Sequence, residues 1–246
     1  MRQILERLVS QGEVNVGQLA TGFAVSEATI RRDLAALEEQ RLLQRTRGGA
    51  RTHSGLNDVP LRFKVVDRLE EKRRIARRAY ELMGEARVIG MSGGTTTTAL
   101  SQLLLERDDL TLVTNALNIA VDALSTRGPR VFVAGGEARN GSYETVGPTA
   151  DEHLRRYNLD ITFFGVDGID ARAGCTIYDP AGAHTNLVLT LRAARVVVLA
   201  DSHKVGRVAF TSVCPIDAVD VLITDSDAPP AALDEIAAAG VEIVVV

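Results

Sequence analysis

Residues 26–39 carry side chains whose types and spacing suit nucleic-acid binding. Ser26 can cap a helix over this segment, and Ile30, Leu34 and Leu37 then form a narrow apolar face. The outer face is small and basic near its N-terminal end, as in a helix that enters the DNA major groove. The residues predicted to contact DNA from this helix are Ser26, Ala28, Thr29, Arg31 and Arg32. Taken alone, the segment is explained equally well as an ordinary amphipathic helix with solvated arginines.

A second group of candidate residues lies in a small, polar segment after residue 91. A backbone of such residues at the start of a helix can approach an anion closely, and the helix N-terminus adds partial positive charge. The predicted anion-binding residues are Ser92, Gly93, Gly94, Thr95, Thr96 and Thr97. The pattern alone fits a plain strand-to-helix turn as well as a phosphate-binding loop.

Further polar residues are expected just past the ends of strands. Asn115 offers hydrogen bonds to hydroxyl groups, and Lys204 could contact a phosphate. Asp167 and Asp170, with Gly168 between them, could bind sugar hydroxyls, act as acid and base, or hold a metal. The alternatives are Asx-type turns for the two aspartates and contact with water alone for the lysine.

The first 52 residues contain the elements that would position the basic helix. Apolar spacing predicts helices over residues 2–11 and 16–23, with Gly12 ending the first and Asn15 capping the second. A tight turn then leads into the helix that begins at Ser26. This order of short helices is a helix-turn-helix.

A basic hairpin is predicted after these helices. Residues 42–47 and 50–52 have the character of strands, with a turn at Gly48 and Gly49. Such a hairpin is a wing that can contact phosphates or the minor groove. Its predicted DNA contacts are Arg45, Arg47 and Arg51. Residues 1–52 hold eight Lys/Arg and six Asp/Glu, so the placement of the arginines carries the signal, not their number.

The remainder of the chain alternates between strands and helices. Residues 53–66 have no sustained periodicity and are predicted to form a linker. Asp67 and Glu70 resemble a capping box for a helix that runs to about residue 83. Short apolar strands are predicted at 87–91, 110–114, 130–134, 160–166, 196–200, 219–224 and 241–246. Helices are predicted at 95–106, 117–125, 148–156, 182–194 and 230–239. This pattern predicts an α/β domain over residues 67–246, with a mostly parallel sheet covered by helices on both faces.

The N-terminal motifs resemble the DNA-binding region of DeoR-family bacterial transcriptional regulators. The resemblance rests on Val25-Ser-Glu-Ala-Thr-Ile-Arg-Arg-Asp-Leu and on Arg45-Thr-Arg-Gly-Gly-Ala at the expected separation. It implies a winged helix-turn-helix over residues 1–52. Two residues depart from the family pattern, since Arg41 replaces a usual Gly and Arg47 a usual His.

The later motifs resemble the sensor domain of the same family, which is similar to sugar-phosphate isomerases. They include Gly94-Thr-Thr-Thr, Gly165-Val-Asp-Gly-Ile-Asp and Leu199-Ala-Asp-Ser-His-Lys. The resemblance implies that the threonine-rich loop binds phosphate and that the two aspartates bind the sugar. The departures here are Ser92 in place of Asp, Gly182 in place of Glu and Asn186 in place of Lys, so that effector choice or response can differ in this chain.

Composition is consistent with a cytoplasmic protein that has no membrane-spanning segment. The chain has 246 residues, two cysteines and no apolar run of membrane-spanning length. Its net charge is −4 although residues 1–52 have a basic excess, so the larger domain is acidic and is expected to stay off DNA phosphates. The four histidines show no paired ligand spacing, and no metal site or cofactor is expected.

These expectations combine into a transcriptional regulator, by resemblance a repressor of a carbohydrate-metabolism operon. It would bind double-stranded operator DNA as a homo-oligomer, under the control of a phosphorylated sugar or related metabolite. A sugar-phosphate isomerase-like enzyme is the first alternative, although no catalytic residues are predicted because Gly182 lacks a carboxylate. A regulator that has lost its small-molecule response, or a module that only binds a partner, are the others.

Overall fold

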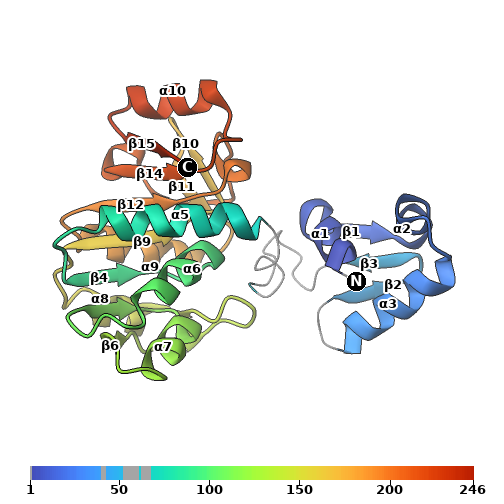
Figure 1. The fold of residues 1–246 in the computed structure, drawn as a ribbon, viewed down its shortest axis with the longest axis horizontal. Coiled ribbons are helices and arrows are strands. Elements are labelled where there is room, and N and C mark those ends of the chain that lie inside the picture. The colour runs from blue at the N-terminus through green and yellow to red at the C-terminus, as the bar shows by residue number, and fades with distance from the viewer. Residues whose placement is uncertain (1, 40–42, 52–60, 62–67) are drawn as a thin grey trace. The chain divides into compact units, whose positions relative to one another are not determined.

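The computed structural model of the protein describes residues 2–39, 43–51, 61 and 68–246. The chain forms two compact units, Met1–Asp67 and Arg68–Val246, and each is described by itself (Figure 1). The predicted linker, apart from Leu61, and the Arg41 departure lie outside the described residues.

The N-terminal unit has three helices and a small antiparallel sheet. Its elements are α1 (Arg2–Gln11), β1 (Glu13–Asn15), α2 (Val16–Phe23), α3 (Glu27–Glu39), β2 (Gln44–Thr46) and β3 (Gly49–Arg51). The three helices and the hairpin are confirmed, whereas β1 was not predicted. This strand is only three residues long and contributes one buried apolar side chain, Val14, which is too short a pattern to show alternation.

The caps predicted for two of these helices are present. Asn15 Oδ1 accepts a hydrogen bond of 2.8 Å from Gly17 N at the start of α2. Ser26 Oγ accepts one of 3.1 Å from Thr29 N at the start of α3. Side-chain oxygens in these positions satisfy N–H groups that have no partner within the helix. The unit's core is the apolar cluster that includes Ile30, Leu34 and Leu37, the face that the spacing predicted.

The turn of the hairpin differs from the prediction by one residue. Arg47 and Gly48 form the turn, and Gly49 is the first residue of β3, where it pairs with Thr46 and with Asn15. A Cβ on Gly49 would lie 1.7 Å from the carbonyl oxygen of Val14. Gly49 is therefore required for the close approach of β3 to β1 and not for the turn.

The C-terminal unit is built on a seven-stranded parallel sheet, as predicted. In spatial order its strands are β15 (Glu242–Val245), β14 (Val221–Thr224), β12 (Val196–Leu199), β9 (Ile161–Gly165), β4 (Val88–Met91), β5 (Thr111–Thr114) and β6 (Arg130–Val133). All neighbouring pairs in this sheet are parallel. Most of its strand residues are buried, which explains why the sequence shows short continuous apolar runs.

Helices cover both faces of this sheet. On one face, α5 (Leu69–Leu82), α6 (Thr95–Leu104) and α7 (Leu117–Leu124) enclose one apolar cluster. Figure 1 shows α5 and α6 crossing in front of the strands. On the other face lie α8 (Pro148–Leu154), α9 (Pro180–Leu191) and α10 (Pro230–Ala238), with two further clusters.

Two small β structures of this unit were not predicted. One is an antiparallel sheet of β10 (Gly168–Asp170), β11 (Gly174–Ile177) and β13 (Thr211–Cys214). The other is a hairpin of β7 (Glu137–Ala138) and β8 (Thr145–Val146). Strands of two to four mixed residues give little periodic signal. Single-turn 3₁₀ helices, η1 (Ser202–Lys204) and η2 (Ile216–Ala218), complete the unit.

Two helix starts also differ from the prediction. Helix α5 has Arg68 as its N-cap, at a φ of 50° and with no side-chain cap, so the expected capping box is wrong. Asp67, its proposed first member, lies outside the described residues. Helix α9 begins at Pro180, because Asp179 caps it by accepting a 2.6 Å hydrogen bond from Gly182 N.

Candidate functional site

The outer face of α3 is arranged as its sequence predicts. Ala28 and Arg32 are exposed, whereas Ile30 and Leu34 are buried with 1% exposure each. Helix α3 therefore presents a small residue and an arginine side by side on its solvent face. This face has the shape and the donors that base edges of the major groove require.

Arg31 lies beside the wing instead of on the outer face of α3. Its guanidinium forms an ion pair of 2.6 Å with Glu27, one turn earlier. Arg31 and Glu27 line a cleft of about 240 Å³ together with Arg45 and Arg47. Three arginines thus surround a space that also contains one carboxylate, an arrangement suited to binding a DNA phosphate.

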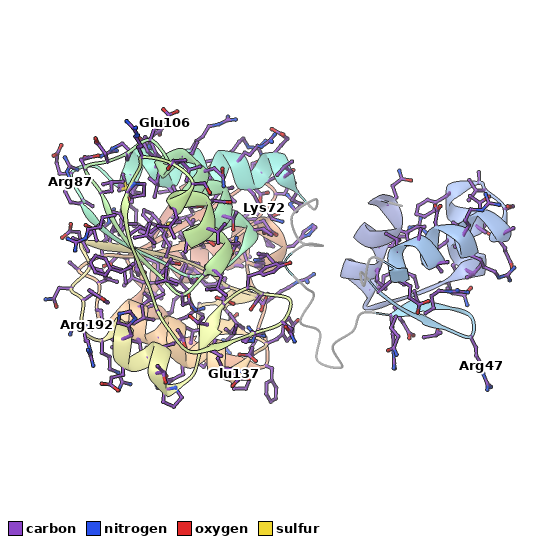
Figure 2. All side chains as sticks on the ribbon, turned by 90° about the horizontal axis from the view of Figure 1, so that it is seen from below. Arg47, Lys72, Arg87, Glu106, Glu137 and Arg192 are labelled. Atoms are coloured by element: carbon purple, nitrogen blue, oxygen red, sulfur yellow. The ribbon has the colours of Figure 1, made fainter. Side chains whose placement is uncertain are left out.

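The wing arginines have different surroundings. Arg45 is hydrogen-bonded to α3, because its backbone N–H donates a 3.0 Å hydrogen bond to Glu38 Oε1. Arg51 Nε donates a hydrogen bond of 2.9 Å to Gln44 Oε1 across the hairpin. Arg47 is exposed at the turn, and Figure 2 shows its side chain extending away from the unit. Of the three, Arg47 is the one placed at the tip of the wing.

Most of the predicted effector residues follow the carboxyl ends of strands of the parallel sheet. From β4 the chain passes to β5 on one side, while the later strand β9 lies on the other side and leads to β12. Such a change of direction leaves a crevice beyond the carboxyl ends of the two central strands, where ligands of α/β proteins bind. Ser92 follows β4, and Ser92 Oγ accepts a 3.3 Å hydrogen bond from Gly165 N at the end of β9.

The threonine-rich loop opens α6 without a side-chain cap. Gly94 is the N-cap residue and has a φ of 138°, a conformation that favours glycine. Thr97 Oγ1 donates 3.0 Å back to the Gly94 carbonyl. Thr96 is 3% exposed, and its Oγ1 has no hydrogen-bond partner within the described part of the chain. Buried polar atoms are nearly always paired, so this hydroxyl is an exception among the described residues.

Asn115 is fully buried at the end of β5 and holds the β7–β8 hairpin. Its Nδ2 donates 3.1 Å to the Thr145 carbonyl, and its own carbonyl accepts 2.8 Å from Thr145 N. Asn115 Oδ1, however, has no partner among the residues that the structure describes. The residue thus fixes the hairpin and retains one open acceptor.

The two aspartates after β9 occupy different positions. Asp167 lies between β9 and β10 and is half-buried, and its Oδ2 accepts 3.2 Å from Tyr178 N. Asp170 ends β10, where its Oδ1 accepts 2.9 Å hydrogen bonds from Ala173 N and Arg172 N. These N–H groups lower the pKa of Asp170. Asp170 therefore forms the turn that the sequence left open as an alternative.

The remaining predicted effector residues are Gly168 and Lys204. Gly168 is buried at the start of β10, and a Cβ there would lie 2.4 Å from the Arg207 carbonyl oxygen. Lys204 is half-buried in η1, just after β12. The groups of His, Cys, Asp and Glu in the described ranges include no cluster that could hold a metal.

Glu144 and Arg139 are residues of this site that the sequence did not single out. Gly93 N donates a 3.1 Å hydrogen bond to Glu144 Oε1, so a carboxylate lies against the glycine-rich loop. Arg139 Nη1 lies 3.6 Å from Glu144 Oε2. In the sequence both residues look like ordinary charges between two predicted elements, and only the hairpin brings them to the loop.

Comparisons with known proteins agree with both halves of this description. A model of the DeoR-like helix-turn-helix domain matches residues 1–55, and a model of the DeoR C terminal sensor domain matches residues 67–226. The chain belongs to the DeoR family. It is a DNA-binding transcriptional regulator with an N-terminal helix-turn-helix and a C-terminal sensor domain.

Several curated DeoR-family relatives align with nearly the whole chain. The HTH-type transcriptional regulator GlpR of Haloferax volcanii is 33% identical over 99% of this chain and 95% of its own length. The glycerol-3-phosphate regulon repressor of Escherichia coli K12 is 32% identical over 92% of this chain and 90% of its own length. The HTH-type transcriptional repressor GlcR of Bacillus subtilis is 32% identical over 98% and 93%.

A solved structure similar to part of this DeoR-family chain is a D-ribose-5-phosphate isomerase in complex with phospho-erythronic acid. The TM-score is 0.41 and the identity 20%, over 55% of this chain and 53% of that chain. This likeness is weak and concerns the fold alone. Within the described part of the chain, no helix is both long and apolar enough to cross a membrane.

Proposed function

We propose that this regulator represses a carbohydrate-metabolism operon in the cytoplasm and that a phosphorylated sugar or a related metabolite controls it. The functions named for its relatives support this proposal, since one is a glycerol-3-phosphate regulon repressor. The observation that carries it is the loop after β4. Beyond the carboxyl end of β4, this loop combines the backbone of Gly93 and Gly94 with the buried hydroxyl of Thr96, which has no partner among the described residues.

In this proposal, the phosphate and the sugar of the ligand contact residues that follow neighbouring strands. The loop of residues 92–97 binds the phosphate, with Lys204 as a cation near the end of β12. Asp167, Gly168 and Asp170 beyond β9, and Asn115 beyond β5, bind the hydroxyl groups. The ligand changes DNA binding only through its different affinities for the two states of the protein.

The proposed DNA interface combines the outer face of α3 with the wing. Ala28, Thr29 and Arg32 read base edges, while Arg31, Arg45, Arg47 and Arg51 hold phosphates, and Ser26 fixes the helix start. One N-terminal helix-turn-helix unit contacts few base pairs. The proposal therefore includes a homo-oligomer that presents at least two such units to an operator.

Fluorescence anisotropy on DNA from the protein's own upstream region tests this function. Salt is held constant, because phosphate contacts make affinity depend on salt. Sequence-selective binding that one member of a sugar-phosphate panel releases is the expected result. Binding that no compound changes would contradict the effector part, and equal affinity for unrelated DNA would contradict the operator part.

We further propose that the sensor domain does not catalyse sugar-phosphate isomerisation. Proton abstraction needs a base within hydrogen-bond reach of the substrate. Gly182 has no carboxylate, and Asp170 Oδ1 accepts hydrogen bonds from two backbone N–H groups. A coupled assay with a pentose phosphate is expected to show no turnover, and measurable turnover would contradict this part.

A further inference from the structure

A carboxylate of the chain itself fills part of the loop proposed to bind phosphate. Glu144 has a side chain that is 12% exposed, and its Oε1 accepts the 3.1 Å hydrogen bond from Gly93 N. A Cβ on Gly93 would lie 2.5 Å from Glu144 Cγ. The absence of a side chain at Gly93 is therefore what admits Glu144. Its anionic group takes up a backbone donor that an external anion would use.

Arg139 is the cation that faces this carboxylate. Its Nη1 lies 3.6 Å from Glu144 Oε2, and its Nε lies 3.3 Å from Asp179 Oδ1 at the N-cap of α9. The Arg139 side chain is 18% exposed. Gly182 packs closely beside it, since a Cβ there would lie 3.5 Å from Arg139 Nη1 and 3.2 Å from Asp179 Oδ1. A guanidinium with two carboxylate neighbours can exchange one of them for a phosphate.

The backbone next to Glu144 is in an uncommon conformation. Tyr143 has a φ of 60°, which is rare for a bulky residue and costs conformational energy. The strands that flank this tip are held by Thr145, whose Oγ1 donates 2.6 Å to the Ala134 carbonyl. Strain of this kind is concentrated at ligand clamps and switch segments.

We propose that Glu144 occupies the place of the ligand's phosphate in the ligand-free protein, and that Arg139 binds this phosphate once Glu144 has left. The inference rests on the proposed function, because it assigns a phosphate to the same loop. Two anionic groups cannot share the Gly93 N–H at hydrogen-bond distance without strong repulsion. Binding therefore selects ligands whose charge is high enough to replace a carboxylate, and neutral sugars do not displace Glu144.

Calorimetric titration of the full-length protein with inorganic phosphate, at constant ionic strength, tests the inference. Glu144→Gln keeps the shape and an oxygen acceptor for Gly93 N but removes the charge. We expect it to bind phosphate about tenfold more tightly than the parent, since a like charge beside the anion is gone. Glu137→Gln is the matched control, because Glu137 is an exposed residue of the same hairpin and loses the same charge (Figure 2). It should bind phosphate like the parent.

A second substitution tests the role of Arg139. In the double variant Glu144→Gln/Arg139→Gln the gain in phosphate affinity should be lost, because the receiving cation is absent. Equal phosphate affinity in Glu144→Gln and Glu137→Gln would overturn the inference. Weaker binding in Glu144→Gln would also overturn it, by showing that Glu144 holds the ligand. If Glu144→Gln does not fold, the single variant Arg139→Gln tests the inference. It should bind phosphate more weakly than the parent, and unchanged phosphate affinity refutes the inference.

The same preparations separate this inference from the proposed function. Operator binding and its release by a sugar phosphate are measured on the parent protein. A parent that binds and releases DNA, combined with no gain in Glu144→Gln, rejects the displacement of Glu144 and leaves the regulator intact. A parent that does not bind its upstream DNA rejects the operator proposal, whatever the phosphate affinities are.

Discussion

Arg68 donates a 2.8 Å hydrogen bond to Asp225, a residue 157 positions later whose side chain is fully buried. The same guanidinium donates 2.9 Å to Asp227. Asp225 in turn accepts 2.7 Å from Ser202 N, so one carboxylate joins the start of α5 to the segments after β14 and β12. The first residue of the sensor unit is thereby fixed to the edge of the sheet where the proposed effector binds.

Replacing Asp225 with Asn should strongly destabilise the sensor unit. The change removes the one fully buried carboxylate among the described partners of Arg68, whose own side chain is only 13% exposed, and breaking a buried ion pair costs roughly 3 kcal/mol. Urea unfolding followed by tyrosine fluorescence measures this, since all four tyrosines lie in the sensor unit. Asp227→Asn is the control: its side chain is 68% exposed, and the loss should stay below about 1 kcal/mol. Equal losses in the two variants would contradict the prediction.

The Asp225 carboxylate should also contribute to acid unfolding. Burial alone would raise its pKa, but the Ser202 N–H and the charge of Arg68 outweigh burial and lower the pKa of Asp225. The stabilisation is therefore present above the unfolded pKa of about 3.9 and is lost as pH falls through the lower folded value. Urea midpoints measured from pH 6 to pH 3 should fall less steeply in Asp225→Asn than in the parent. Parallel curves would show that another group dominates.

Two neighbouring threonines of the loop should respond differently to valine. Thr96→Val removes a hydroxyl that has no described partner, so stability should be unchanged while effector affinity is lost. Thr97→Val removes the 3.0 Å hydrogen bond to the Gly94 carbonyl and should cost about 1 kcal/mol of stability. Sugar-phosphate titration and urea unfolding of both variants check this. Undiminished effector affinity in Thr96→Val would remove that hydroxyl from the site.

Arg32→Ala should weaken operator binding and relax its base preference. Arg32 is exposed on the outer face of α3, and losing such an arginine costs about 1–3 kcal/mol. Anisotropy with operator DNA and with single-base variants at fixed salt measures both effects. If the variant binds operator like the parent, α3 enters the groove with a different face.

Arg47→Ala should weaken binding to all DNA sequences alike. Arg47 extends from the turn of the wing (Figure 2), where it can contact phosphates but is not on the recognition helix. The slope of log affinity against log salt should decrease by about 1, the effect of one lost phosphate contact. A selective loss of operator affinity would instead place Arg47 at base edges.

The sequence predicted the parallel sheet and the faces of α3 because both leave a clear apolar pattern, short continuous runs for the strands and helical spacing for α3. Seven apolar strands alternate with helices, and Ile30, Leu34 and Leu37 recur at helical spacing. The caps Asn15 and Ser26 were also predictable, since their function depends on residues two or three positions away.

The elements that sequence reasoning missed depend on distant contacts. Strand β1 exists because Gly49 lets β3 approach Val14, a relation between segments that are separate in the sequence. Glu144 reaches Gly93 from 51 residues away. The sequence predicted an anion site at the glycine-rich loop, which stays a prediction. It did not predict the contact of Glu144 with this loop, because no local pattern shows which charged residue a distant hairpin brings there.

The wing is part of a three-stranded sheet and is not a free arm. Its strand β3 is paired on both sides, and Val16 N donates a 2.9 Å hydrogen bond to the Gly48 carbonyl at the turn. The conformational entropy of ordering this hairpin is therefore lost when the unit folds, before any DNA is present. In the proposed interface, operator binding then needs to order only the arginine side chains. The helix and the wing would meet DNA as one preformed surface, which favours a fixed spacing between the proposed base contacts and the proposed phosphate contacts.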